Sequence, residues 1–374
     1  MMEMADGTKF ARKNVMDLPP YIPGKPIEAV EREYGVHNAI KMASNENPLH
    51  TSPKAIAAMQ QELENCYLYP EGSSPLLREK LAAKYRVSPE QIIVGDGGEH
   101  IIILACNAFI NEGDETIVCE PTFASYNIYT RLMGGKLIEL SVDKEYRFDV
   151  DAVLAAITPK TKMIFLCNPN NPTSTIIGKK KMQKLMDNIP DHVVVLLDEA
   201  YFEFVSDPDY PDGMDYVRAG KNVIVLRTFS KAYGLAGLRI GYAVAPLHLA
   251  EALGRVIPAF PVTRLSQVAA YAAMDDEEFL TRVIANNEEG RTYLQQQLKE
   301  MGMECAPSSS NFIFVNIGMP SREINEELLR QGVIVRPGFL FNCPEFLRVS
   351  IGTMEENQRF ISALRKIKAE YDAK

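Results

Sequence analysis

The chain has 374 residues, of which 46% are hydrophobic and 24% charged, a composition typical of a globular protein with a sizeable core. Its formal net charge of -9 argues against a nucleic-acid partner, because affinity for a phosphate backbone requires clustered Lys and Arg. No apolar run approaches the roughly 18 residues of a membrane span, and the first residues lack the pattern of a signal peptide. We therefore expect no membrane partner and a cytoplasmic protein.

The cysteine and histidine residues indicate neither disulfides nor a metal site. Six cysteines are scattered along the chain, mostly inside apolar runs, and none forms a C-x-x-C pair. This pattern is typical of reduced thiols in a core. The five histidines do not occur at the spacing of a zinc site, so no metal is predicted.

The length predicts about two domains of roughly 150 residues. Before residue 90, a proline-bearing irregular arm precedes two predicted helices, over 53–64 and 75–84. From about residue 90, short apolar runs alternate with helical periodicity, which is typical of a mostly parallel sheet flanked by helices. The predicted strands are 91–94, 115–119, 136–140, 162–167, 193–198, 223–227 and 239–245, with helices such as 99–110, 122–133 and 178–188.

The pattern changes after Pro261. A long helical stretch over about 263–301 is followed by short apolar runs and further helical segments, which predicts a smaller α+β domain. The predicted strands there are 311–317, 332–338 and 346–352, and the predicted helices are 320–331 and 354–372. The fold class is thus α/β with a large and a small part. We expect an N-terminal arm over 1–44 that packs with the small domain, a large domain over 45–261 and a small domain over 262–374.

Ligands of open α/β sheets bind at the carboxyl ends of the strands, so the residues that follow each strand carry the functional signal. "GDGGEH" (95–100) follows the first strand, and its glycines suit either a phosphate or a plain tight turn. "NPNNPTS" (168–174) can be turn chemistry alone. Asp198, at the end of a buried strand, can be a helix cap, a structural ion pair or a catalytic carboxylate.

Lys231 in "RTFSKAYGLAGLRIGY" (227–242) tips this balance towards catalysis. A buried lysine has a lowered pKa and can attack an aldehyde. Thr228 and Ser230 can donate hydrogen bonds to a phosphate, and Arg239 can bind the same phosphate with two charge-assisted bonds. Pyridoxal 5′-phosphate combines an aldehyde with a phosphate and needs a carboxylate beside its ring nitrogen, which Asp198 can supply.

With these residues in place, the chain resembles the fold-type I pyridoxal-phosphate aminotransferases and, within them, the histidinol-phosphate aminotransferases. The resemblance covers residues 21–353, nearly the whole chain. The motifs that carry it are "SNENPL" (44–49), "YPEGSSPLLREKLA" (69–82), "GDGGEH", "PTFASY", "NPNNPTS", "DEAYFEF", "RTFSKAYGLAGLRIGY" and "FLRVSIGT".

The resemblance implies a role for each matching cofactor residue. Lys231 would bind the cofactor covalently and then act as the general base, and Asp198 would pair with its ring nitrogen. The remaining contacts implied are Asn171 and Tyr201 to the ring oxygen, Phe123 stacked on the ring, and Gly98 and Glu99 (through backbone N–H) with Thr228, Ser230 and Arg239 around the phosphate.

The resemblance also implies substrate contacts and a partner subunit. Tyr69 matches a tyrosine that reaches the phosphate in the neighbouring subunit, which implies a homodimer with shared sites. Arg348 matches the arginine that binds the substrate carboxylate. Tyr21 and Arg336 match positions that meet the phosphate of the substrate, and Asn47 is a further expected substrate contact.

Two segments depart from the family pattern. Ser174 stands where glycine is usual, which would alter the turn near the substrate. The phosphate loop usually has an asparagine and a serine where this chain has Asp96 and Gly98. Because the expected contacts there come from backbone N–H groups, we expect phosphate binding to survive beside the added charge of Asp96.

The expected reaction is transamination of L-histidinol phosphate, a phosphorylated amino alcohol, with 2-oxoglutarate, by a ping-pong route in histidine biosynthesis. An aromatic amino-acid aminotransferase and a threonine-phosphate decarboxylase of the same fold are the alternatives. A non-catalytic regulator would normally carry a basic DNA-binding extension, which the sequence lacks. A nicotinamide-dependent dehydrogenase would leave Lys231 without a role, and "GDGGEH" lacks its fingerprint. The sequence does not settle the choice among histidinol phosphate, phenylalanine and tyrosine.

Overall fold

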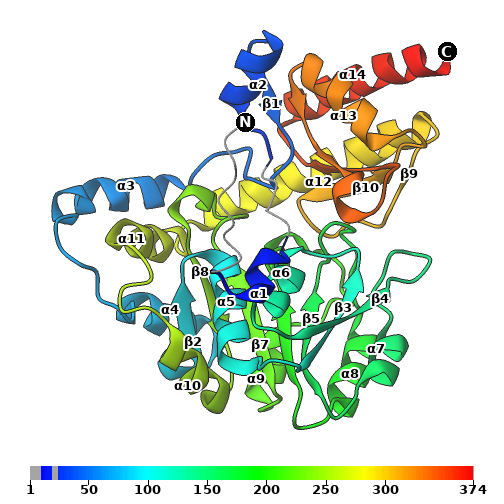
Figure 1. Cartoon of the computed structure of the whole chain (residues 1–374). Coiled ribbons are helices and arrows are strands. Elements are labelled where there is room, and N and C mark those ends of the chain that lie inside the picture. The colour runs from blue at the N-terminus through cyan, green and yellow to red at the C-terminus, as the bar shows by residue number, and fades with distance from the viewer. Residues whose placement is uncertain (1–9, 19–23, 374) are drawn as a thin grey trace.

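A computed structural model of the chain describes residues 10–18 and 24–373 (Figure 1). Its largest feature is a seven-stranded sheet in which six strands run parallel and β8 runs antiparallel to both of its neighbours. The predicted mostly parallel sheet is therefore confirmed. In sheet order the strands are β2 (Ile92–Gly95), β8 (Gly241–Val244), β7 (Val223–Thr228), β6 (Val194–Asp198), β5 (Thr161–Cys167), β3 (Glu115–Glu120) and β4 (Lys136–Ser141).

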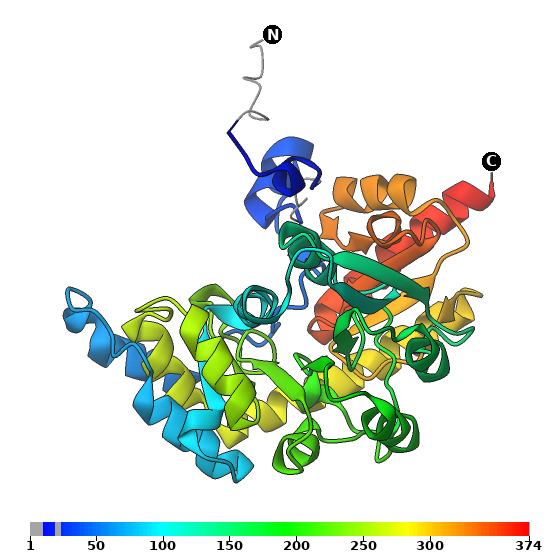
Figure 2. The ribbon, with the colours of Figure 1, turned by 60° about the horizontal axis from the view of Figure 1, so that its bottom comes forward.

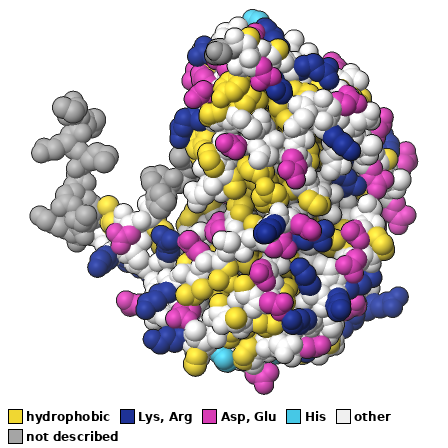
Figure 3. Space-filling model, turned by 90° about the vertical axis from the view of Figure 1, so that its right-hand side faces the viewer, with side chains coloured by type: hydrophobic (Ala, Val, Ile, Leu, Met, Phe, Trp, Pro, Cys, Tyr) yellow, Lys and Arg dark blue, Asp and Glu magenta, His cyan; other side chains and the backbone are white. Residues whose placement is uncertain are grey.

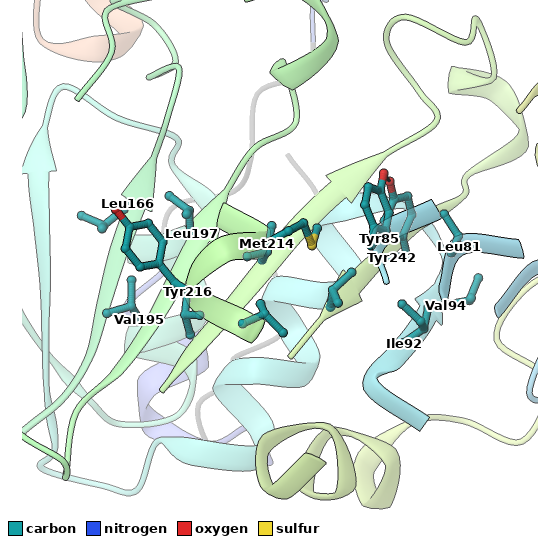
Figure 4. Packing of buried hydrophobic residues seen from close by; sticks show 14 of the residues in the cluster. Leu81, Tyr85, Ile92, Val94, Leu166, Val195, Leu197, Met214, Tyr216 and Tyr242 are labelled. Atoms are coloured by element: carbon teal, nitrogen blue, oxygen red, sulfur yellow. Dashed lines mark hydrogen bonds between the residues drawn. The ribbon is translucent and has the colours of Figure 1, made fainter. Parts of the chain in front are cut away.

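The apolar runs form strands because both faces of the sheet are covered. Side chains alternate between the faces, so Val195 and Leu197 lie in one apolar cluster while Leu196, between them, lies in the other. Figure 4 shows part of the first cluster, where Met214 packs over the strands and the ring of Tyr242, on β8, lies beside that of Tyr85. Each fully buried aliphatic side chain of this kind stabilises the fold by about 1.5–3 kcal/mol.

Helices supply the other half of each cluster. One face is covered by α5 (Gly97–Phe109), α6 (Ser125–Leu132) and α10 (Leu247–Val256). The other face is covered by α4 (Pro75–Tyr85), α7 (Val150–Ala156), α8 (Lys179–Asn188) and α9 (Gly213–Arg218). Two further helices, α3 (Pro53–Glu62) and α11 (Arg264–Ala273), lie side by side at one end of the molecule in both ribbon views (Figure 2).

The C-terminal part contains a second sheet. Its strands, in order, are β12 (Arg336–Pro337), β13 (Phe346–Ser350), β10 (Phe312–Asn316) and β9 (Glu304–Cys305), and they pack with α12 (Glu277–Glu300), α13 (Ser321–Arg330) and α14 (Met354–Asp372). The N-terminal segment joins this part, because β1 (Ile40–Lys41) pairs in parallel with β11 (Val333–Ile334). Short α1 (Lys13–Met16) lies beside α6.

Two expectations about helices are wrong. The single helical stretch predicted over 263–301 is two helices, because the Asp276 carboxylate between them accepts a hydrogen bond from the Ser52 hydroxyl at 2.6 Å and so ties the break to the start of α3. Residues 27–34, where no helix was predicted, form α2 (Ile27–Tyr34), which begins after Pro26 and buries Val30 in a small apolar cluster with Leu329.

Two strand boundaries also differ from the prediction. The strand predicted over 239–245 begins only at Gly241, because Arg239 adopts a left-handed conformation with φ 50°. The run 332–338 divides into β11 and β12, which belong to different sheets.

The surface is of mixed charge on the face shown in Figure 3, where lysine and arginine side chains are interspersed with aspartate and glutamate. Across residues 10–18 and 24–373, no helix is both long and apolar enough to cross a membrane.

Candidate active site

A cleft lies at the carboxyl edge of the large sheet, facing the C-terminal sheet. Strands β5, β6 and β7 are adjacent and in register, with Cys167 opposite Asp198 and Asp198 opposite Leu226, so the loops after them meet at this edge. The predicted site residues that line the cleft are Gly98, Glu99, Phe123, Asn171, Asp198, Tyr201, Thr228, Ser230, Lys231, Arg239, Arg336 and Arg348.

Lys231 follows β7 and projects into the cleft half-buried. Its Nζ donates a hydrogen bond to the carbonyl oxygen of Ser44 at 3.0 Å. Burial, and then the positive charge of Arg348, lowers the pKa of this amine to about 8. With this pKa about a tenth of the amine is neutral at pH 7, a far larger fraction than in an unperturbed lysine, and the neutral form is the one that acts as a nucleophile or general base.

Asp198 is the last residue of β6 and is buried. Burial raises the pKa of its carboxyl group, and a hydrogen bond from the Tyr126 hydroxyl at 2.7 Å acts in the opposite direction. The backbone N–H of Ala200 donates to the other carboxylate oxygen at 3.0 Å. Both donors favour the ionised form, which is the form that can pair with a protonated ring nitrogen.

Asn171 and Tyr201 reach the cleft from the loops after β5 and β6. The Asn171 side-chain oxygen accepts a hydrogen bond from Arg348 Nη1 at 2.6 Å. The Tyr201 hydroxyl accepts one from Asn45 Nδ2 at 3.0 Å, and burial raises the pKa of this phenol. Phe123, after β3, contacts the edge of the buried ring of Tyr126 with centroids 5.7 Å apart.

The start of α5 forms a cradle for an anion. Gly97 has φ 82°, and a Cβ on it would lie 2.4 Å from Nη2 of Arg239, so only glycine lets this guanidinium approach the helix end. Thr228 and Ser230 flank the same space. Free N–H groups of a helix N-terminus, two hydroxyls and an arginine are the donors that a phosphate requires. The exposed side chain of Asp96 makes no capping bond to the helix.

Two arginines face the cleft from the C-terminal sheet. Arg336 of β12 and Arg348 of β13 are direct partners in the antiparallel pairing, so both lie on the same face of the sheet. Like charges in directly opposed positions are unfavourable, and an anion bound between them removes that penalty. Arg348 is nearly buried and also donates from Nη2 to the carbonyl oxygen of Ala43.

Two predicted site residues lie outside the cleft, and a third cannot be placed because it is not among the described residues. Tyr69 is 78% exposed and stacks on Phe260 with ring centroids 4.6 Å apart, away from this chain's cleft. The Asn47 side chain donates to the carbonyl oxygen of Ala232 at 2.9 Å and accepts from the N–H of Leu49, so it braces the segment after Lys231 from outside the cleft. Tyr21 lies outside the described residues.

Ser44, Asn45 and Tyr126 are contacts that the sequence reasoning missed. Ser44 and Asn45 lie within "SNENPL", where the motif was noted without a role for either residue. Tyr126 lies in the first turn of α6, three residues after Phe123. A tyrosine in an apolar helix is indistinguishable from core until its hydroxyl is seen to donate to Asp198.

Comparisons with known proteins agree with this geometry. Residues 37–364 match the model of the family Aminotransferase class I and II, and the chain belongs to this family. The cofactor of such enzymes, pyridoxal 5′-phosphate, fits the residues present: a buried lysine of lowered pKa, a buried carboxylate and an anion cradle closed by Arg239.

Similar relatives belong to one class within this family, the histidinol-phosphate aminotransferases. The chain is 47% identical over 359 residues to a histidinol-phosphate aminotransferase of Moorella thermoacetica, covering 96% of this chain and 93% of that protein. It is 44% identical to histidinol-phosphate aminotransferase 2 of Carboxydothermus hydrogenoformans, covering 96% and 99%. Its structure is similar, with a TM-score of 0.87 at 25% identity and coverage of 96% and 98%, to histidinol-phosphate aminotransferase from Sinorhizobium meliloti in complex with pyridoxal-5′-phosphate.

Proposed function

We propose that this pyridoxal-phosphate-dependent aminotransferase transfers the amino group of L-histidinol phosphate to 2-oxoglutarate, a step of histidine biosynthesis. The products are imidazole-acetol phosphate and glutamate. The observation that carries the proposal is the in-register pair Arg336 and Arg348, which faces the cleft that holds Lys231. The relatives named above, which share most of their length with the chain, point to the same substrate.

The residues of the chain divide the chemistry between them. When bound, the cofactor withdraws electrons from the substrate carbon that carries the amino group and so makes the hydrogen on that carbon acidic. Lys231 would take this proton and deliver it to the C4′ carbon of the cofactor. Asp198 would keep the ring nitrogen protonated, and Asn171 and Tyr201 would hydrogen-bond the ring oxygen.

The remaining residues would hold the cofactor in place. Phe123 would stack on its ring. Its phosphate would be bound by the backbone N–H groups of Gly98 and Glu99, by the hydroxyls of Thr228 and Ser230, and by Arg239.

The two arginines would let one site accept two dissimilar substrates. Histidinol phosphate has a phosphate and no carboxylate, whereas 2-oxoglutarate has two carboxylates. Arginine binds either group with two parallel hydrogen bonds, so a change of substrate needs no change of residue. In this proposal Arg336, with Tyr21, binds the distal anion, which is the phosphate or the second carboxylate, and Arg348 binds the carboxylate next to the reacting carbon.

A pair of arginine variants tests this assignment. Arg336→Gln should lower kcat/KM for histidinol phosphate by at least about tenfold, because a hydrogen-bonded ion pair contributes about 1.5–3 kcal/mol. Arg348→Gln should lower kcat/KM mainly for 2-oxoglutarate, which serves as the matched comparison. If Arg336→Gln leaves histidinol phosphate turnover intact and L-phenylalanine is the better donor, the protein is an aromatic amino-acid aminotransferase instead.

We further propose that the enzyme works as a homodimer with shared sites. The connection between α3 and α4 exposes the apolar side chains of Leu63, Tyr67, Leu68 and Tyr69, of which Tyr69 stacks on exposed Phe260, and Leu76 is exposed in the first turn of α4. Exposed apolar groups of this extent are typical of a subunit contact. A partner seated here would bring its own Tyr69 towards the phosphate cradle of this chain.

The division into an arm over 1–44, a large domain over 45–261 and a small domain over 262–374 stays a proposal. Separate apolar clusters beside the two sheets support it. Ala269 and Ala270 of α11 pack in the cluster of the large sheet, so the first helix after residue 261 stays attached to the large part. A cytoplasmic location is also proposed, in keeping with the free thiols of its cysteines, of which Cys106, Cys119 and Cys167 are buried.

A further inference from the structure

Ser174 has a backbone conformation that disfavours any residue with a Cβ. It is fully buried at the end of the turn that follows β5, and its φ of 64° lies in the left-handed region. Glycine adopts this conformation without cost, whereas serine does not. Strain of this kind persists only where surrounding contacts offset it.

The contacts of Ser174 come from the loop before β10. Its side-chain oxygen accepts hydrogen bonds from the backbone N–H groups of Ser309 and Ser310, both at 3.1 Å. Its hydroxyl also lies within hydrogen-bond reach of the hydroxyls of Ser310 at 2.5 Å and Ser308 at 3.1 Å. The backbone carbonyl oxygen of Ser174 accepts a further bond from the N–H of Ser309 at 2.9 Å, so side chain and backbone of Ser174 together join the turn after β5 to the loop before β10.

Hydrogen bonds and strand pairing connect this junction to Arg348, the arginine proposed to bind the substrate. Ser308 and Ser310 donate to the carbonyl oxygen of Phe312, the first residue of β10. Strand β10 pairs with β13, where Phe314 is opposite Arg348. Arg348 Nη1 donates a hydrogen bond to Asn171, which lies in the same turn as Ser174.

We propose that Ser174 is a positioning residue that holds the turn carrying Asn171 against residues 308–310, and thereby fixes where Arg348 receives the carboxylate of the keto-acid acceptor. The inference rests on the proposed function for the identity of that acceptor. Without the Ser174 hydroxyl, only the backbone bond from Ser309 to Ser174 and the bond between Arg348 and Asn171 join the turn to the C-terminal part at this point. A carboxylate that binds Arg348 then competes with Asn171 for the guanidinium, and so disturbs the bond that fixes the position of Arg348.

Two substitutions separate the hydroxyl from the backbone strain. Ser174→Ala removes the oxygen and keeps the strain, whereas Ser174→Gly removes both, so the glycine variant should melt at a higher temperature than the alanine variant. Ser309→Ala is the matched control, because it removes a hydroxyl from the same loop but keeps the N–H that bonds to Ser174. Steady-state and half-reaction kinetics of the holoenzyme would be measured for all three.

Both Ser174 variants should raise KM for 2-oxoglutarate by about fivefold and change the half-reaction with histidinol phosphate by less than about twofold, as expected for the loss of a buried hydrogen-bond acceptor. Hydrogen exchange should accelerate at the amide of Ser310, which donates to the Ser174 side chain, more than at the amide of Ser309, which also donates to the Ser174 carbonyl oxygen. An unchanged KM, an equal change in both half-reactions, or an effect confined to Ser174→Ala would overturn the proposal. If the wild type rejects histidinol phosphate, the proposed function fails, and L-glutamate with 2-oxoglutarate still decides the role of Ser174.

Discussion

At the scale of single residues, the burial of Lys231 disfavours the charged form of its amine. Its pKa is about 8 in the folded protein against 10.5 for an unperturbed lysine. Between these values the unfolded chain binds more protons, so the stability of the apoprotein should rise with pH; below pH 8 the buried ammonium destabilises the fold in full. Apoprotein carrying Lys231→Met should therefore melt no lower than wild type at pH 7, and the difference should shrink towards pH 10.5. Lower melting at every pH would contradict this.

Tyr126 also acts at the scale of one residue, through its hydrogen bond to the buried carboxylate of Asp198. A bond to a charged group contributes about 1.5–3 kcal/mol, so Tyr126→Phe should weaken cofactor binding by about tenfold. Removing this donor raises the pKa of Asp198 further, so binding should fail at a higher pH as the solution is acidified. Absorption titrations of apoprotein with cofactor across pH measure both effects. A variant with the wild-type pH profile would show that the bond only fills space.

At the scale of elements, the phosphate cradle depends on the approach of Arg239 to the start of α5. Gly97→Ala should weaken cofactor binding by at least about tenfold, because the new methyl group takes the position of the guanidinium. Gly113→Ala is the matched control, since Gly113 has φ 87° and open space where its Cβ would lie. Both variants should lose about 1–2 kcal/mol of stability to backbone strain. Equal cofactor affinity in the two variants would show that Arg239 does not contribute to phosphate binding.

The elements also show where prediction from sequence succeeds. Strands β3, β5, β6 and β7 end within one residue or so of the predicted boundaries, because continuous apolar runs are most stable in a sheet covered on both faces. Lys231 and Asp198 follow such runs, which sets their positions at one edge. Sequence periodicity did not predict the break between α11 and α12, because that break depends on Asp276 bonding Ser52, more than 200 residues away.

Individual side-chain partners were harder to predict than the edge on which they lie. Asn47 was expected to contact the substrate in the cleft. Its side-chain amide instead forms hydrogen bonds with backbone groups, one of them next to Lys231. The neighbouring Asn45 reaches Tyr201 instead. The two side chains point to different partners although they are only two residues apart, because a loop has no periodicity from which side-chain direction could be predicted.

At the scale of the whole molecule, shared sites make a quantitative prediction. Tyr69→Ala and Lys231→Ala would each inactivate a homodimer, because each site needs Lys231 from one subunit and Tyr69 from the other. In a mixed dimer, one site receives both damaged residues and the other receives neither. Refolding the two variants together in equal amounts should therefore restore about a quarter of the wild-type activity. Activity no higher than that of the separate variants would contradict the shared-site dimer.

The most direct test of the central claim is a visible-absorption titration of the cofactor-loaded enzyme with L-histidinol phosphate, run in parallel with L-phenylalanine. We predict that the band of the lysine-bound cofactor bleaches at low histidinol phosphate and returns on addition of 2-oxoglutarate. Bleaching by L-phenylalanine alone would contradict the proposed substrate, and the absence of any such band after incubation with cofactor would contradict the role of Lys231.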